Sequence, residues 1–136
     1  MTNTISKELL NPPSWKKPRG YTNLVKTTGG TTLHVAGQAS FDAEGKLVGE
    51  GDICKQYEQT LHNIQEVLAT GGAKMSDIVR MTIFLTDRDG FFKGGKEIGQ
   101  IYKKYFGDYY PASTLVEIKK LLIDGMMIEI ELTAVI

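Results

Sequence analysis

The sequence predicts an α+β fold, in which a β-sheet carries two helices packed on one of its faces. Residues 127–135 alternate strictly between two kinds of side chain, which is typical of a β-strand whose faces meet different surroundings. Residues 53–68 instead repeat apolar side chains at three- and four-residue spacing, which indicates an amphipathic helix. The expected elements follow one another in the order ββαβαββ, and this order favours the layered architecture.

The chain is expected to form one domain, because its 136 residues are enough for a single core. Residues 1–19 are predicted to be an irregular N-terminal arm laid on the surface. They contain Pro12, Pro13 and Pro18, and they show no apolar periodicity. The domain itself is expected to span residues 20–136.

Two strands are predicted at the start of the domain, at residues 23–27 and 31–36. Gly29-Gly30 lies between them and is a typical hairpin signal, so the two strands are expected to pair with each other. Gly45 indicates a further turn within residues 41–48.

The first helix is expected to begin after Asp52, a suitable N-cap residue, and to end at Gly71-Gly72. Its apolar face would consist of Ile53, Tyr57, Leu61, Ile64 and Leu68. Cys54 lies in the first turn, where a helix N-terminus could lower the pKa of a thiol. No histidine partner is evident, however, so a packed or idle thiol is expected.

A strand is predicted at residues 78–86, with apolar side chains on both of its faces. A second helix is predicted at about residues 92–106, where Gly94-Gly95 would weaken the first turns by roughly 1 kcal/mol per glycine. Strands at residues 113–119 and 126–135 are expected to close the chain.

The strand at residues 78–86 also predicts an oligomer. Two helices can cover only one side of the sheet, so the apolar side chains on its other side must be buried by another layer. A second subunit is the simplest such layer.

The charge balance argues against nucleic acid as the main ligand, because 16 basic and 16 acidic residues cancel. The single cysteine, Cys54, excludes an internal disulfide and a cysteine-based zinc site. The sequence contains no signal-peptide pattern and no apolar run of about 20 residues, so we expect a cytoplasmic protein with no membrane partner. His34 and His62 have no carboxylate at ligand spacing, so we expect no metal site.

Several blocks of the sequence occur in an order that is typical of one known family. They are Gly20-Tyr21, Val35-Ala36-Gly37-Gln38, residues 59–64, 77–87 and 102–106, Pro111-Ala112, and Ile128-Glu129-Ile130-Glu131. From about residue 20 to its end, the chain resembles the reactive-intermediate (imine/enamine) deaminase family, also called the Rid, YjgF or L-PSP family. The resemblance implies a mixed β-sheet of the chorismate-mutase-like type, a homotrimer with a barrel-like centre, and pockets between adjacent subunits.

The chain departs from the best-known members of this family at the pocket. Those members carry an arginine after Pro-Ala that binds the substrate carboxylate, and Ser113 stands in its place here. Leu115 and Ala36 stand where the family has a cysteine and a serine. A hydroxyl group cannot replace the charge and the planar fork of a guanidinium. We therefore expect a substrate that is not a simple 2-imino acid.

The resemblance assigns roles to particular residues. Glu129 is the expected catalytic residue, which would activate water and move protons as ammonia leaves. The expected substrate-binding residues are Tyr21, Ala36, Phe92, Ser113, Thr114 and Leu115. Without the resemblance, Glu129 could instead be an exposed strand carboxylate, and Tyr21 could be a packing residue.

These residues lead to the hypothesis of a cofactor-free hydrolase of the imine/enamine deaminase type. It would act on a small C=N or C–N metabolite in a pocket between subunits. Two alternatives stay open. The same trimeric scaffold could bind a small molecule or regulate a partner without catalysis, because polar pocket residues are replaced. The L-PSP label would imply cleavage of RNA, which predicts an RNA affinity that falls steeply with salt.

Overall fold

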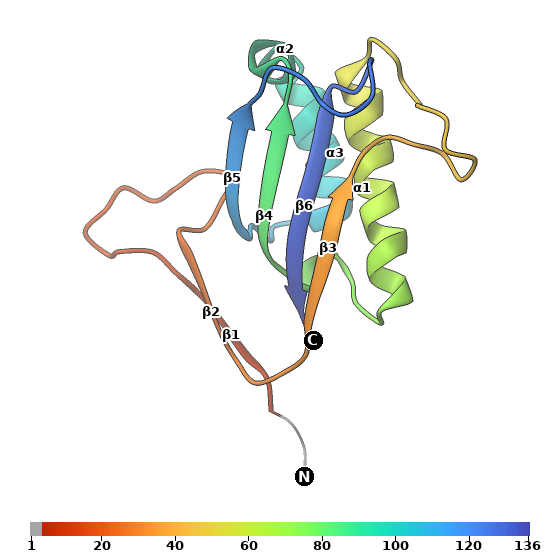
Figure 1. The fold of residues 1–136 in the computed structure, drawn as a ribbon. Helices are drawn as coiled ribbons and strands as arrows, with labels where there is room; N and C mark the ends of the chain where they lie inside the picture. The colour runs from red at the N-terminus through yellow and green to blue at the C-terminus, as the bar shows by residue number, and fades with distance from the viewer. Residues whose placement is uncertain (1–3) are drawn as a thin grey trace.

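The computed structural model describes residues 4–136 and contains a four-stranded sheet and a separate two-stranded ribbon (Figure 1). The strands of the sheet, in the spatial order β3-β6-β4-β5, are β3 (Thr32–Gln38), β6 (Ile128–Val135), β4 (Ile78–Leu85) and β5 (Ala112–Glu117). β4 and β5 are parallel, whereas β6 is antiparallel to both β3 and β4. The predicted α+β fold with a mixed sheet is confirmed.

Helices α1 (Ile53–Thr70) and α3 (Gly95–Phe106) cover one face of the sheet (Figure 1). A 3-10 turn, η1 (Met75–Asp77), leads into β4. The predicted N-cap of α1 is confirmed, because Asp52 Oδ1 accepts a hydrogen bond from the backbone N–H of Lys55 at 3.1 Å. The largest apolar side chains that are completely buried come from α1, β4 and β6: Leu61, Ile64, Leu68, Ile78, Leu85, Ile128 and Ile130.

The alternation of β6 appears directly in its burial. One face of the strand is buried against the helices, through Ile128, Ile130, Leu132 and Ala134. The other face carries Glu129, which lies in one row with Phe84 of β4 and Val116 of β5. No helix among residues 4–136 covers this opposite face (Figure 1), and the three residues of the row are only half-buried.

Two predictions for the N-terminal part are wrong. The predicted irregular arm contains β1 (Ser6–Leu10), which pairs antiparallel with β2 (Leu24–Thr28) to form the ribbon. Its residues 1–3 lie outside the described residues. The predicted hairpin between residues 23–27 and 31–36 does not form either, because β2 pairs with β1 while β3 pairs with β6.

Close packing at the turn explains why β2 and β3 separate. A Cβ atom on Gly29 would lie 2.5 Å from the backbone oxygen of Thr4, and one on Gly30 would lie 2.7 Å from that of Ile136. Thr31 and Ile136 also exchange two backbone hydrogen bonds, of 2.6 and 3.0 Å. The turn is therefore held between the N-terminal segment and the C-terminus. Both ribbon strands are mostly exposed, so they lack the apolar alternation that would reveal β1 in the sequence.

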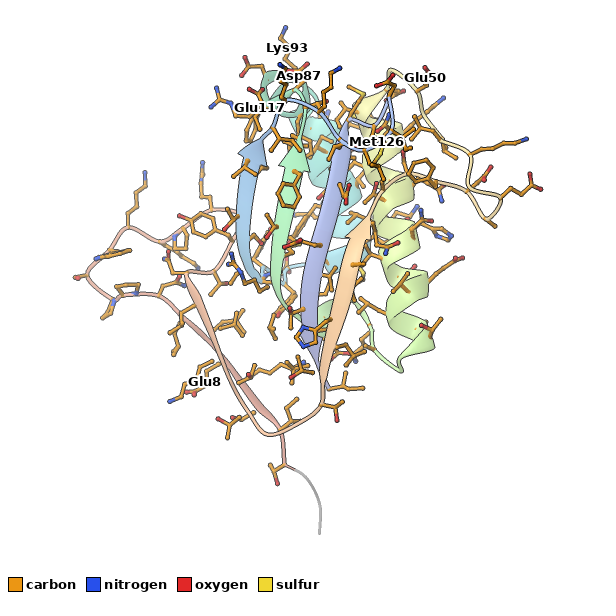
Figure 2. All side chains as sticks on the ribbon, viewed as in Figure 1. Glu8, Glu50, Asp87, Lys93, Glu117 and Met126 are labelled. Atoms are coloured by element: carbon orange, nitrogen blue, oxygen red, sulfur yellow. The ribbon has the colours of Figure 1, made fainter. Side chains whose placement is uncertain are left out.

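The second predicted helix, at residues 92–106, is divided into α2 (Arg88–Lys93) and α3, which meet at Gly94. Asp87 caps α2 by accepting a hydrogen bond from the backbone N–H of Gly90 at 3.0 Å. The backbone N–H of Arg88 donates to Glu117 Oε1 at 3.0 Å, so α2 begins beside the end of β5. Figure 2 shows Asp87 and Glu117 together at this end of the sheet.

The break at Gly94 lies against the first helix. A Cβ atom on Gly94 would lie 3.1 Å from Cys54 Sγ, which is closer than most side chains approach. Glycine therefore allows α1 to pack closely at the point where the chain changes from α2 to α3. Within residues 4–136, no helix is both long enough and apolar enough to cross a membrane.

Candidate functional site

Two hollows contain five of the seven predicted site residues: Glu129 in one, and Tyr21, Phe92, Ser113 and Leu115 in the other. The larger hollow, here called the aromatic cavity, has a volume of about 870 Å³ and lies between strands β4 and β5 and helices α2 and α3. Six aromatic side chains line it: Tyr21, Tyr57, Phe91, Phe92, Tyr102 and Tyr110. Ser113 and Leu115 also line this cavity. The smaller hollow, here called the Glu129 cleft, has a volume of about 420 Å³ and lies among α1, the loop after β3 and the loop before β6.

The carboxylate of Glu129 lies against the backbone of Gly37. A Cβ atom on Gly37 would be 2.0 Å from Glu129 Oε1 and 2.8 Å from its Cδ atom, so glycine leaves the space that the carboxylate fills. Gly37 lies where the pairing of β3 with β6 is irregular, between Val35 and Gln38. Both Gly37 and Glu129 line the cleft, which places the carboxylate at a hollow and outside the packed core.

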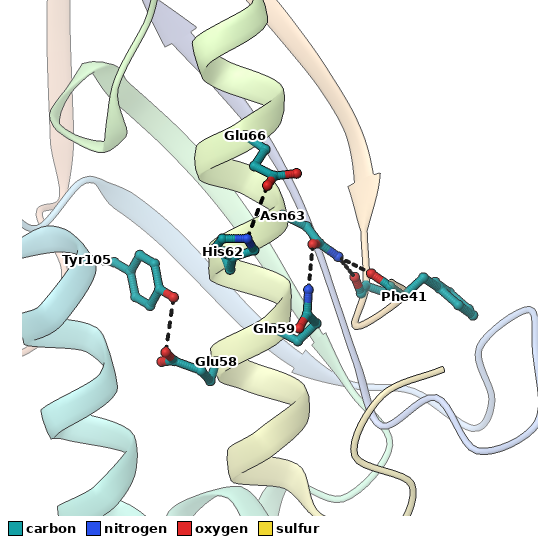
Figure 3. A network of polar contacts seen from close by, with 8 residues as sticks. Phe41, Glu58, Gln59, His62, Asn63, Glu66 and Tyr105 are labelled. Carbon is teal, nitrogen blue, oxygen red and sulfur yellow. Dashed lines mark hydrogen bonds and ion pairs between the residues drawn. The ribbon is translucent and has the colours of Figure 1, made fainter. Parts of the chain in front are cut away.

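Hydrogen bonds from α1 hold the outer wall of the Glu129 cleft (Figure 3). Asn63 Nδ2 donates to the carbonyl of Ala39 at 2.8 Å and to that of Phe41 at 2.7 Å. Gln59 Nε2 donates in turn to Asn63 Oδ1 at 2.8 Å. The loop after β3 is thus fixed to the helix, and the chain next to Gly37 has a defined path.

Strand register separates Ser113 and Leu115 from Glu129. Ser113 and Leu115 pair with two buried residues of β4, Met81 and Ile83, which face the helices. Glu129 pairs with Phe84, which directly follows Ile83, and successive side chains point to opposite faces of a strand. A single chain therefore presents Ser113 and Leu115 on one face of its sheet and the expected catalytic carboxylate of Glu129 on the other.

The remaining expected binding residues lie at the mouth of the aromatic cavity or outside both hollows. Tyr21 is 42% exposed and Phe92 is 60% exposed, and both line the cavity. Thr114 points away from the cavity, and its Oγ1 accepts a hydrogen bond from Arg80 Nη2 at 3.5 Å. Ala36 is exposed on β3 and lines neither hollow. The structure thus brings Tyr21 and Phe92 together with Ser113, but not with Thr114 or Ala36.

Three cationic side chains that the sequence analysis did not identify also line the aromatic cavity. They are Arg19, Lys96 and Lys103, and all are exposed, which places their charged groups at the mouth. Within the described chain, no Asp or Glu lines this cavity. The sequence contains a pattern that could have indicated two of these cations together. Lys96 and Lys103 are separated by about two helical turns, so they share one face of α3.

Tyr57, which is buried, and Tyr102, which is partly buried, form a neutral wall of the cavity. Desolvation raises the pKa of Tyr57 and of Tyr102 well above the ordinary value for tyrosine. The Tyr102 hydroxyl donates to the carbonyl of Tyr109 at 2.6 Å, and its ring stacks on that of Tyr110 with the centroids 5.1 Å apart. These hydroxyls stay protonated at neutral pH, so the wall supplies apolar surface and carries no negative charge.

Cys54 is not an activated thiol. Burial raises the pKa of its thiol to about 11, and a hydrogen bond to Glu97 acts in the same direction. The pKa of this thiol is therefore raised and not lowered, and the thiol is buried, as the absence of a histidine partner indicated. Among residues 4–136, no group of three or more His, Cys, Asp or Glu residues could hold a metal ion. His62 instead lies 3.1 Å from Glu66 on the exposed side of α1 (Figure 3).

Comparison with known proteins places the chain among one group of relatives. The family model described as Endoribonuclease L-PSP matches residues 15–136. The chain is 34% identical to a RutC family protein of Pyrococcus abyssi, over 96% of this chain and 98% of that protein. It is 29% identical to the human 2-iminobutanoate/2-iminopropanoate deaminase, over 76% of this chain and 72% of that protein.

Solved structures give the same grouping. The chain is similar to YyfB from Yersinia pestis, a protein of the conserved Rid family, with a TM-score of 0.85 and 32% sequence identity. That similarity covers 96% of this chain and 98% of YyfB. It is also similar to TdcF of E. coli, solved with bound serine, with a TM-score of 0.65 and 26% identity over 78% of this chain and 81% of TdcF.

Proposed function

Because the chain belongs to the Rid/YjgF/L-PSP family, we propose that it is a cofactor-free imine/enamine deaminase that hydrolyses a small C=N metabolite. The placement of Glu129 carries this proposal: its carboxylate fills the space over Gly37 and lines a cleft. The reaction type is supported by relatives that bear the name 2-iminobutanoate/2-iminopropanoate deaminase. Ser113 supports a substrate that is not a simple 2-imino acid, because it leaves the cavity wall without the arginine of the best-known members.

The active site would form between two subunits of an oligomer, which the family resemblance implies to be a trimer. The Glu129 cleft of one subunit would meet the aromatic cavity of its neighbour. Two observations support this arrangement. Ser113 and Glu129 lie on opposite faces of one sheet, so one chain does not unite them. Phe84 and Val116 are half-buried on a face that no helix of residues 4–136 covers, and a second subunit would bury them.

The proposed reaction needs only water and one carboxylate. Glu129 accepts a proton from water as the water oxygen attacks the C=N carbon, and it returns a proton to the nitrogen, which gives a carbinolamine. Glu129 then moves the hydroxyl proton to the amino group, the C–N bond breaks, and ammonia leaves as the C=O bond forms. One imine and one water become one carbonyl compound and one ammonia, without oxidation or reduction.

The substitution Glu129→Gln tests the proposed role of the carboxylate. A flavin-dependent amine oxidase would generate imines from benzylamine and 2-phenylethylamine, and a coupled glutamate dehydrogenase would record the released ammonia. The wild-type protein should accelerate this release above spontaneous hydrolysis. Glu129→Gln should lower the acceleration by about 10²- to 10⁴-fold, since an amide cannot accept the proton.

Glu131→Gln is the matched control for this experiment. Glu131 lies two residues further along β6 and is exposed, and it does not line the cleft. Its variant should keep the activity of the wild type. The proposal would be contradicted by the absence of acceleration on every imine, or by equal rates for the wild type and Glu129→Gln.

Mixed oligomers test the placement of the site between subunits. Gly99 lies in α3 at the cavity, and a Cβ atom there would meet no atom within 4 Å, so Gly99→Phe should block the cavity without disturbing the core. Glu129→Gln and Gly99→Phe should each be inactive alone. Co-expressed subunits should recover activity, because some interfaces combine an intact carboxylate with an intact cavity. Verified mixed oligomers without any recovery would place the site within one chain.

A binding or regulatory function without catalysis is the second candidate. It is favoured by Leu115, an apolar residue on the cavity wall where the best-known members have a cysteine. If the protein has this function, a small molecule should bind to the folded state and raise the melting temperature of the protein by mass action. The stabilisation should then be the same in the wild type and in Glu129→Gln, and ammonia release should stay at its spontaneous rate.

A further inference from the structure

We propose that the aromatic cavity binds an amphipathic carboxylate, whose apolar body fills the cavity and whose charged group lies at the mouth beside Arg19, Lys96 and Lys103. This inference rests on the proposed function, because it names the substrate class for the same site. In such a substrate the anionic group is remote from the reacting C=N carbon. The class therefore differs from 2-imino acids, in which carboxylate and imine are adjacent.

The charges around the cavity favour an anion. Arg19, Lys96 and Lys103 take part in none of the ion pairs found within residues 4–136, and no carboxylate among those residues lines the cavity with them. The single acidic residue of α3, Glu97, lies elsewhere, next to Cys54. The mouth therefore carries positive charge that no acidic side chain of its own lining offsets, and such an opening attracts anionic ligands.

The interior of the cavity favours an apolar body. Beyond its aromatic residues, it is lined by Met81, Ile83, Ile98 and Leu115, all of which belong to the core or pack against it. Its volume of about 870 Å³ is in the range of pockets that hold ligands of drug size, which is far larger than a four-carbon imino acid requires. A branched or aromatic group would bury this apolar surface and gain the corresponding free energy.

Ser113 decides where the charged group can lie. Its hydroxyl donates to the carbonyl of Pro111 at 3.1 Å, so the wall offers a carboxylate neither a cation nor a free donor at this position. An unpaired carboxylate in an apolar interior loses its hydration without compensation. The carboxylate must therefore stay at the mouth, where water and the three cations solvate it, and only the apolar body enters.

Binding of 4-phenylbutanoate tests this inference without any need for turnover. Isothermal titration calorimetry would compare it with 4-phenylbutan-1-ol, which lacks the charge, and with butanoate, which lacks the ring. The phenylbutanoate should bind about tenfold more tightly than the alcohol, and its affinity should fall as salt is added. Butanoate should bind too weakly to detect, because it leaves the apolar interior unfilled.

Three sets of variants assign this binding to the cavity. The triple variant Arg19→Gln, Lys96→Gln, Lys103→Gln should bind the acid about tenfold more weakly and should no longer distinguish it from the alcohol. The matched triple variant Lys46→Gln, Lys74→Gln, Lys119→Gln removes three exposed lysines that do not line the cavity, and its affinity should be unchanged. Gly99→Phe should abolish binding of both ligands, and Gly99→Ala should retain it.

The outcomes separate this inference from the proposed function. Equal affinity for the acid and the alcohol, or equal losses in the two triple variants, would overturn the inference even if imines are hydrolysed. Selective binding of the acid that persists in Glu129→Gln would support the inference, whether or not ammonia is released. The absence of ammonia release would count against the deaminase proposal alone.

Discussion

At the scale of single residues, Gly37 controls the place of Glu129. The carboxylate occupies the position that any larger side chain at residue 37 would need. The backbone of Gly37 does not have a positive φ angle, so glycine is required there by the contact and not by its conformation. The Gly-Gln pair of the Val-Ala-Gly-Gln block is thereby linked to the glutamate of β6, although the two are far apart in the sequence.

The substitution Gly37→Ala should displace the Glu129 carboxylate while the fold persists. The new Cβ atom would be 2.0 Å from Glu129 Oε1, so the side chain must rotate away. Ammonia release should fall by about 10²-fold, as expected for a misplaced catalytic group. The free energy of unfolding should change by less than about 1 kcal/mol, because only a flexible side chain has to move.

A double-mutant cycle shows whether Gly37 acts through Glu129. In the Glu129→Gln background, Gly37→Ala should cause no further loss of rate, because the group that it displaces is already inactive. If the two substitutions instead lowered the rate by independent factors that multiply in the double variant, Gly37→Ala would damage the site in another way.

At the scale of elements, Gln56 connects α1 to two loops at the end of the sheet. Its side chain is completely buried. Gln56 Nε2 donates to the carbonyls of Gly49 at 3.2 Å and of Gly125 at 2.9 Å, and its Oε1 accepts a hydrogen bond from the backbone N–H of Met127 at 2.8 Å. The helix thus positions the segment that leads directly into β6 and Glu129.

The substitution Gln56→Leu should lower the free energy of unfolding by about 3 kcal/mol, because it removes three hydrogen bonds and leaves partly buried backbone groups without partners. Urea unfolding followed by circular dichroism would measure the change. Gln65→Leu is the control, since Gln65 is exposed on the same helix and should change the stability by less than about 0.5 kcal/mol. Equal effects of the two substitutions would show that the three hydrogen bonds contribute nothing.

At the scale of the whole molecule, the partly buried Tyr109 joins the segment after α3 to the start of β4. The Tyr109 hydroxyl donates a hydrogen bond to the carbonyl of Ile78, at the start of β4. Burial raises the pKa of Tyr109 from the ordinary value of 10.0 to about 12, with a smaller contribution from Asp77. Because the folded state holds this proton more tightly than the unfolded chain, the resulting stability is fully present below pH 10 and is lost as the pH rises through 12.

Tyr109→Phe should reveal this dependence on pH. At about pH 8 the variant should be less stable by about 1 kcal/mol, because it lacks the hydrogen bond. Between pH 10 and pH 12 the wild type should lose stability more steeply than the variant, so the difference between them should shrink. Urea unfolding at a series of pH values would measure it. A difference that is constant up to pH 12 would contradict the raised pKa of Tyr109.

The sequence determined the features that depend on neighbouring residues. The alternation in β6, the periodic face of α1 and the Asp52 cap all follow from local geometry, because side-chain direction repeats every two residues in a strand and every 3.6 in a helix. The choice of Glu129, Tyr21, Ser113 and Leu115 as site candidates also came from the sequence, through the family resemblance.

Only the tertiary structure decided which of these residues meet. The pairing of β2 with β1 depends on contacts of Gly29 and Gly30 with both ends of the chain, which no local pattern encodes. The separation of Glu129 from Ser113 depends on strand register, and the cationic mouth depends on Arg19 approaching α3 across the fold. Such long-range contacts are fixed by packing, which selects one arrangement among many that share the same local pattern.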